Sequence, residues 1–142
     1  MPISRANAVW NGGLRGGRGE YSASSGAFKG AYSFATRFEG AQGTTPEELL
    51  AAAHAACFSM ALAAGLERSG TPPTEIATTA SCTFEKVGDA FRATKMHLET
   101  RGKVPGIDQA AFAKAAAAAK DGCPVSHALT GIETVTVRAT LE

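Results

Sequence analysis

The sequence of 142 residues has no long uninterrupted hydrophobic run and a formal net charge of only +1. Its most apolar stretch, residues 49–64, is mostly alanine and is interrupted by His54 and Ser59. We therefore expect a buried core helix there and no membrane span. The near-zero charge gives no electrostatic reason to expect nucleic acid or an acidic membrane as a partner, because the two arginines of residues 12–19 are too few to form a basic patch.

The N-terminal segment MPISRANAVW contains no apolar region of the kind found in secretory signals. We therefore expect a cytoplasmic protein. In that reducing compartment the three cysteines are expected to be core residues, metal ligands or reactive thiols, and not structural cross-links. The length suits one domain over residues 1–142, and no linker or repeat divides it.

Three short β-like runs precede the first long helix. They cover residues 7–10, 20–24 and 31–37 and are separated by glycine-rich turns. This pattern predicts a small N-terminal sheet, with Arg37 at the end of its last strand.

A long helix is predicted from Pro46 onward. Thr45 suits the N-cap, Pro46 the first helical position, and Glu48 follows the cap by three residues, as in a capping box. Gly70 suits the C-cap. The middle of this helix is apolar on nearly every face, so we expect the fold to surround it.

A hairpin and two shorter helices are predicted after Pro72-Pro73. Residues 78–85 and 91–100 alternate apolar and polar side chains around a turn at Gly88-Asp89. Asp108 should cap a helix that ends at Asp121-Gly122, and residues 125–129 should form a short third helix. A final strand with alternating apolar residues spans 133–142. The order predicts an α+β fold with a largely antiparallel sheet.

The three cysteines differ in their local setting. Cys57 lies in the middle of the apolar helix, where a cysteine is usually a small core residue. Cys82 lies on the apolar face of its strand and receives no role. Cys123 precedes Pro124 and should be the N-cap of the third helix, where unpaired N–H groups favour a thiolate. By this argument alone Cys123 is the more nucleophilic thiol.

Histidines accompany two of these cysteines at helical spacing, which leaves two alternatives to a redox pair. His54 precedes Cys57 by three residues, and His127 follows Cys123 by four. The four side chains could form a Cys2His2 metal site, although the usual ligand spacing is missing. His54 could instead serve as the base of a Cys–His hydrolase, although no acid that would orient it is evident.

At this point the sequence resembles a known family. The combination of a PEEL segment, a following HAACF segment and a distant CPVS segment is similar to the OsmC/Ohr family of organic hydroperoxide reductases, and closest to its OsmC branch. The resemblance extends over essentially the whole chain. It is carried by residues 36–40, 44–62, 104–108 and 122–129.

The resemblance implies roles for four residues. Cys57 would be the peroxidatic cysteine and Cys123 the resolving one. Arg37 would hold the Cys57 thiolate, and Glu47 would orient the arginine. It overrules the local argument that Cys123 attacks first, because a mid-helix thiol in apolar surroundings needs a fixed cation beside it and Arg37 can supply one.

The same resemblance implies the assembly and the reaction. The fold would be OsmC-like, with antiparallel sheets wrapped around a long buried central helix in an intertwined homodimer. Its sites would lie at the subunit interface and reduce organic hydroperoxides without a cofactor. An external dithiol would regenerate the enzyme, in the Ohr branch one of the lipoyl type.

Overall fold

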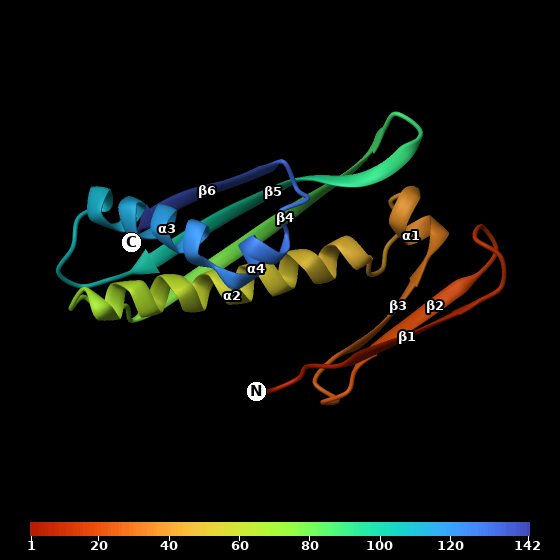
Figure 1. The fold of residues 1–142 in the computed structure, drawn as a ribbon, viewed down its shortest axis with the longest axis horizontal. Coiled ribbons are helices and arrows are strands. Elements are labelled where there is room, and N and C mark those ends of the chain that lie inside the picture. Colours follow the sequence, from red (N-terminus) through yellow and green to blue (C-terminus); the bar gives the residue numbers. More distant parts are fainter. The chain divides into compact units, whose positions relative to one another are not determined.

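The computed structural model describes residues 1–142, which form two units, Met1–Pro46 and Glu47–Glu142 (Figure 1). Each unit has its own three-stranded sheet. The N-terminal sheet contains β1 (Ala6–Asn11), β2 (Arg18–Ala23) and β3 (Lys29–Ser33), all antiparallel. The three predicted strands of this region are therefore present, with one exception at the end of β3.

The exception concerns Arg37. Residues 34–38, expected to continue the strand, form the short helix α1 (Phe34–Phe38). A capping box starts it: the Ser33 side chain accepts from the Thr36 N–H at 3.2 Å, and the Thr36 hydroxyl accepts from the Ser33 N–H at 2.9 Å. These two bonds provide acceptors for the backbone N–H groups of Ser33 and Thr36. In a continued strand these N–H groups would need acceptors on a neighbouring strand. Arg37 thus lies in the last turn of a helix, with its guanidinium over the Phe38 ring.

The predicted long helix is α2 (Pro46–Arg68), which begins at the expected proline. It ends as expected at Gly70, whose φ of +79° requires a residue without a side chain. The Gly70 N–H donates to the Glu67 carbonyl at 2.9 Å, and the Thr71 N–H donates to the Leu66 carbonyl at 3.0 Å. This pair of bonds is a Schellman motif.

One stripe of α2 is buried in a single chain. It contains His54, Phe58, Leu62 and Leu66, spaced four residues apart, while Glu47 is buried near the start of the helix. By length and composition alone α2 could cross a membrane. Its buried stripe, however, packs in the core of the C-terminal unit, which favours the interpretation as a core helix.

The C-terminal sheet has the order β4-β5-β6. β4 (Glu75–Val87) and β5 (Ala90–Lys103) form the predicted antiparallel hairpin, with Gly88 at φ +63° in the turn. β6 (Thr134–Leu141) pairs with β5 in parallel. A parallel neighbour requires a crossover connection, and the two helices between β5 and β6 provide it.

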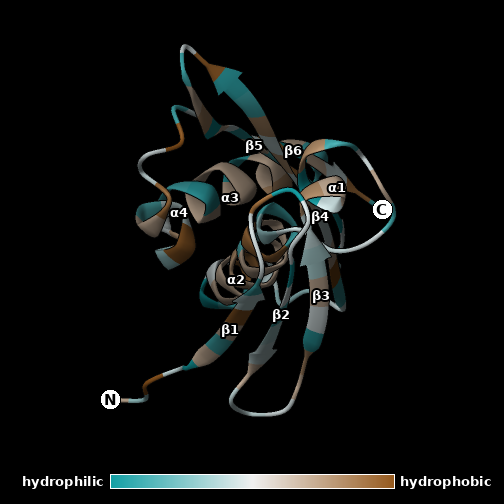
Figure 2. Cartoon of the chain, turned by 90° about the vertical axis from the view of Figure 1, so that its right-hand side faces the viewer, coloured by the Kyte–Doolittle hydropathy of each residue, from teal (hydrophilic) through white to brown (hydrophobic).

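The crossover consists of α3 (Gln109–Gly122) and α4 (Pro124–Ala128), joined at Cys123. Asp108 caps α3 as predicted, because its side chain accepts from the Ala111 N–H at 2.8 Å. Figure 2 looks along α2 and shows α3 beside it. The core of the unit lies between these helices and the sheet and includes Phe58, Leu62, Leu98, Phe112, Ala116 and Cys123.

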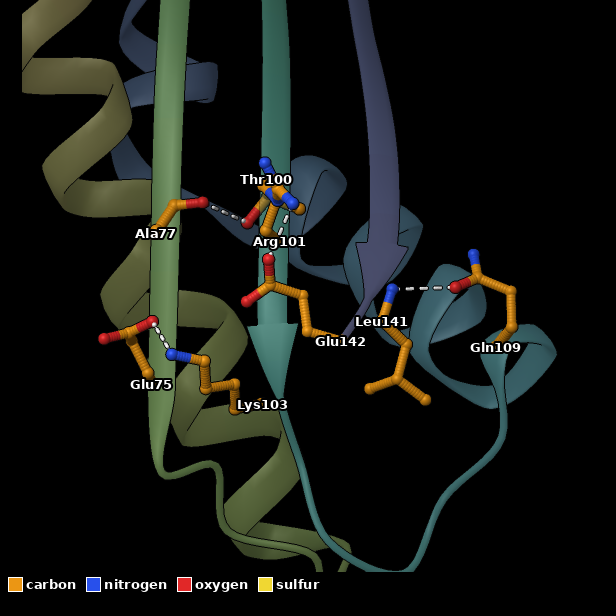
Figure 3. Close-up of polar contacts among 8 residues, drawn as sticks. All are labelled: Glu75, Ala77, Thr100, Arg101, Lys103, Gln109, Leu141 and Glu142. Carbon is orange, nitrogen blue, oxygen red and sulfur yellow. Dashed lines mark hydrogen bonds and ion pairs between the residues drawn. The ribbon is translucent and has the colours of Figure 1, made fainter.

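Side-chain hydrogen bonds hold both helices to the sheet. Ser59 on α2 donates to the Thr78 hydroxyl on β4 at 2.8 Å, and Thr78 in turn lies 2.9 Å from the buried Thr100 hydroxyl on β5. At the other edge Gln109 of α3 accepts from the Leu141 N–H (Figure 3) and donates to the Ala139 carbonyl. Gln109 thus satisfies backbone groups of the edge strand β6 and fixes the start of α3.

Asp108→Ala should destabilise the protein by about 1 kcal/mol, because it removes the side-chain acceptor at the N-terminus of α3. Urea unfolding followed by circular dichroism measures the effect. Asp108→Asn is the matched control and should retain most of the stability, since asparagine caps helices equally well. Equal losses in the two variants would contradict the capping role.

Candidate active site

Cys57 occupies the middle of α2 and is half-buried against the core of the C-terminal unit. Its location is the one expected for a core cysteine. Its thiol, however, lies near the Cys123 side chain and the backbone of Val125, both of which affect its pKa. The most reactive atom of α2 therefore faces the junction between α3 and α4.

Cys123 is the residue at which α3 ends and α4 begins, as predicted from Gly122 and Pro124. Its side chain is 0% exposed. The extended backbone (φ −70°, ψ 124°) lets Pro124 take the first position of α4. The Cys123 side chain makes no capping hydrogen bond, but the backbone of Val125 and Ser126 at the start of α4 lies near its sulfur.

The pKa of the Cys57 thiol is raised above its ordinary value. Burial is the main cause, since it disfavours the charged form. The Val125 N–H acts in the opposite direction, and the neighbouring Cys123 raises the pKa further. Within its own unit Cys57 is therefore held mainly as the neutral thiol.

The pKa of the Cys123 thiol is lowered. Burial alone would raise it, but the backbone of Ser126 and Val125, the Cys57 thiol and the Ser126 hydroxyl lower it and together outweigh burial. The two shifts are linked, because the proximity of the two thiols raises the pKa of Cys57 and lowers that of Cys123. This direction is the one expected from the local setting of Cys123, whose thiolate character stays a prediction.

His54 is fully buried one turn before Cys57 on α2. Its Nε2 lies 2.8 Å from the Ser126 hydroxyl on α4, and its Nδ1 has no hydrogen-bond partner. Burial lowers the pKa of the imidazole, so the ring is neutral near physiological pH. His54 therefore contacts the same short helix that surrounds Cys123.

The other predicted site residues lie elsewhere in their units. Arg37 is in α1 of the N-terminal unit, and Glu47 is buried in the first turn of α2. Cys82 lies on β4, and its pKa is raised by burial and by the negative charge of Glu47. The structure thus brings Cys57 and Cys123 together, while the roles of Arg37 and Glu47 stay predictions.

The two alternative readings of the cysteines and histidines gain no support. No group of three or more His, Cys, Asp or Glu side chains is arranged to hold a metal, so the Cys2His2 site does not form. His127 is exposed on α4. His54 bonds Ser126, which is not the pairing that a Cys–His hydrolase requires.

Ser126 is the residue that the sequence reasoning missed. It stands three residues after Cys123, on the same side of α4, inside the CPVS segment. The spacing from a helix-capping cysteine to a serine one turn later is the signal that could have revealed it. The partner of that serine, His54, is 72 positions away in the sequence and follows only from the fold.

The geometry is that of a dithiol site. Two neighbouring thiols, one of them favoured as thiolate, are the groups that an oxidant joins in a disulfide. All three cysteines are free, so the structure represents the reduced form.

Comparison with known proteins identifies the family of this chain. A family profile described as OsmC-like protein matches residues 39–138. The chain is 48% identical over 126 residues to Peroxiredoxin OsmC of Escherichia coli K12, covering 88% of both chains, and equally similar to Peroxiredoxin OsmC of Shigella flexneri. This protein belongs to the OsmC family.

Solved structures show the same fold. The organic hydroperoxide resistance protein OhrB of Bacillus subtilis superposes with a TM-score of 0.66 at 25% identity, over 97% of this chain and 98% of that one. An organic hydroperoxide resistance protein OsmC of Legionella pneumophila gives a TM-score of 0.68 at 23% identity, over 100% and 99%. The predicted OsmC-like α+β fold is confirmed.

Mild oxidation of the reduced protein with diamide should join Cys57 to Cys123 and leave Cys82 free. The first two thiols are neighbours, whereas burial and Glu47 keep Cys82 protonated and slow to react. Peptide mapping by mass spectrometry under non-reducing conditions identifies the bond. Cys82→Ala should give the same product, and disulfides that include Cys82 would contradict the assignment.

Proposed function

We propose that this protein is a thiol-dependent peroxidase that reduces organic hydroperoxides to alcohols. The observation that carries the proposal is that Cys57 and Cys123 lie close together in one core cluster. Membership in the OsmC family supports it, as do relatives named Peroxiredoxin OsmC and organic hydroperoxide resistance protein.

The proposed cycle begins at Cys57. Its thiolate attacks the distal oxygen of the hydroperoxide, the O–O bond breaks, and the alkoxide takes a proton to leave as the alcohol. Cys57 becomes a sulfenic acid. Cys123 then attacks the Cys57 sulfur, an S–S bond forms, and the sulfenic hydroxyl leaves as water. An external dithiol, of the lipoyl type or similar, reduces the disulfide and is itself oxidised.

The first step needs a group that ionises Cys57, whose pKa is raised within its own unit mainly by burial. A guanidinium beside the sulfur would lower that pKa, and we assign this role to Arg37. A fork-shaped guanidinium engages a carboxylate and a sulfur together, which gives Glu47 its role in orienting the arginine. The contact between Arg37 and Cys57 is itself part of the proposal and adds to the site geometry described above.

We further propose that the enzyme works as a homodimer whose sites combine both subunits. A single chain buries one stripe of the apolar helix α2, so a second copy would cover the rest. About 15 Å of helix rise also separates Glu47 from Cys57. One arginine reaches both more easily if the glutamate comes from the partner chain. In that assembly residues 1–142 act as one peroxidase domain, and reducing conditions in the cytoplasm keep its thiols free.

Cys57→Ser should abolish the consumption of cumene hydroperoxide, because the attacking sulfur is lost. Cys123→Ser should permit the first oxidation and then stall, with the sulfenic acid accumulating and over-oxidising. Loss of peroxide is followed with a dithiol reductant, and the sulfenic acid is trapped with dimedone and located by mass spectrometry. Cys82→Ala is the matched control and should keep its turnover.

The substrate class is tested in the same assay. The wild-type enzyme should reduce cumene or tert-butyl hydroperoxide more efficiently than H2O2. Full turnover by Cys57→Ser would refute the peroxidatic assignment. A preference for H2O2 would leave that assignment intact and refute the organic substrate.

Arg37→Ala should slow the reaction of Cys57 with peroxide by roughly tenfold to a hundredfold, since a hydrogen bond to a charged group is worth about 1.5–3 kcal/mol. It should also move the ionisation of Cys57 to higher pH. Stopped-flow kinetics of the first oxidation measures the rate, and alkylation of Cys57 against pH measures the ionisation.

Two variants separate charge from shape at this position. Arg37→Lys keeps the charge but loses the fork and should recover part of the rate. Glu47→Gln should slow the reaction less than Arg37→Ala does. An alkylation profile of Cys57 that is unchanged in Arg37→Ala would make the arginine structural only.

A further inference from the structure

His54 is the one polar member of the buried stripe of α2. The other three members, Phe58, Leu62 and Leu66, are apolar, and the imidazole itself is 0% exposed. Burying a polar ring costs stability unless its hydrogen bonds compensate for the lost water. A leucine would cover the same part of the core without that cost. We therefore expect the imidazole to have a specific partner.

The partner is Ser126 on α4. The Nε2 atom of His54 lies 2.8 Å from the Ser126 hydroxyl oxygen, and Nδ1 has no hydrogen-bond partner. A buried acceptor without a partner is tolerated more readily than a buried N–H without one. The proton therefore belongs on Nε2, and His54 donates to Ser126. The single hydrogen bond of this ring thus crosses from α2 to α4.

The short helix α4 depends on such tertiary contacts. It contains only five residues, and none of them is fully buried. A helix of this length is not stable by itself in water. Its support comes from Val125, which packs against the core cluster, and from the hydrogen bond of Ser126. Loss of that bond should let α4 move relative to α2.

The contact between His54 and Ser126 lies close to both thiols along the chain. His54 precedes Cys57 by three residues, and Ser126 follows Cys123 by three, which is about 4.5 Å of helix rise. Because α4 starts at Cys123, the placement of α4 also places that cysteine. A hydrogen bond is directional, so it fixes one placement of α4 on α2, whereas apolar contacts alone tolerate sliding.

We propose that the hydrogen bond between His54 and Ser126 is a tether that holds Cys123 beside Cys57 and raises the effective concentration of one sulfur at the other. The inference rests on the proposed function, in which these sulfurs form the disulfide, and it makes His54 and Ser126 positioning residues. When the Cys123 thiolate attacks the Cys57 sulfenic acid, the S–S bond forms, the S–O bond breaks, and the departing hydroxide takes a proton from solvent. The tether speeds this step by keeping the attacking sulfur in place.

The tether and the disulfide stabilise each other by thermodynamic linkage. A tether that restricts α4 in the reduced protein lowers the entropy that is lost when the S–S bond forms. The S–S bond in turn holds Ser126 near His54. The tether should therefore favour the oxidised form over the reduced form. A contact that only stabilises the fold would favour both forms equally.

The test measures the equilibrium constant of the disulfide in the full-length chain with Cys82→Ala as background. The protein is equilibrated with mixtures of reduced and oxidised dithiothreitol, so that each protein disulfide formed reduces one dithiothreitol disulfide. Free thiols are then alkylated, and intact mass gives the oxidised fraction. His54→Leu and Ser126→Ala should each lower the constant by about twofold to tenfold, the factor that corresponds to one net hydrogen bond. The double variant should lose no more than either single variant, because both remove the same bond.

Two amide variants separate the tether from polarity alone. The amide of His54→Gln reaches the position of Nε2 and should keep the constant close to the background value. The shorter amide of His54→Asn reaches only the position of Nδ1 and should lose as much as His54→Leu. Dimedone trapping after a single oxidation gives the rate of the resolving step, and the Cys57 sulfenic acid should live longer in Ser126→Ala by a similar factor.

The outcomes are distinct. An unchanged constant in Ser126→Ala overturns the tether, and so do additive losses in the double variant or equal constants for His54→Gln and His54→Asn. If His54→Leu does not fold, Ser126→Ala and the two amide variants decide instead. The equilibrium uses no peroxide. A wild-type protein that forms the disulfide in dithiothreitol but does not consume cumene hydroperoxide would therefore refute the proposed function alone.

Discussion

The packing of Cys57 and Cys123 in one core cluster brings together two segments that are far apart in the sequence, and most of the C-terminal unit serves to keep them together. α2 carries Cys57 and is held to the sheet by Ser59 and by its buried apolar stripe. The crossover between the parallel strands β5 and β6 carries Cys123. Gln109 fixes the start of that crossover at the sheet edge (Figure 3).

Inside this unit, electrostatics favour the ionisation of Cys123 before that of Cys57. The proposed cycle needs the opposite order. Backbone and side-chain donors gather on Cys123, whereas Cys57 is disfavoured as a thiolate mainly by burial. This order is explained if the attacking thiol, Cys57, needs a cation from outside the unit to ionise and the resolving thiol, Cys123, does not. Assembly of the complete site would then control the ionisation of Cys57, while Cys123 would ionise in every folded chain.

Local rules predicted most of the elements, because their signals are contained in a few adjacent residues. Pro46 and Gly70 mark the ends of α2, Asp108 caps α3, and Cys123 precedes α4 at a proline. The short helix α1 was missed because its capping box uses Ser33 and Thr36, which also suit a strand. The parallel pairing of β6 and the contact of His54 with Ser126 depend on tertiary packing, which single-sequence patterns do not contain.

The position of the thiol pair has a consequence for folding. A bond from Cys57 to Cys123 would enclose β4, β5 and all of α3 in one covalent loop. Such a ring restricts the unfolded chain far more than the folded one, so the oxidised protein would resist denaturation better than the reduced protein. By thermodynamic linkage, the native fold would then favour the closed ring and lower its reduction potential. Catalysis would thus alternate between an oxidised form of higher conformational stability and a reduced form of lower stability, both with the same fold.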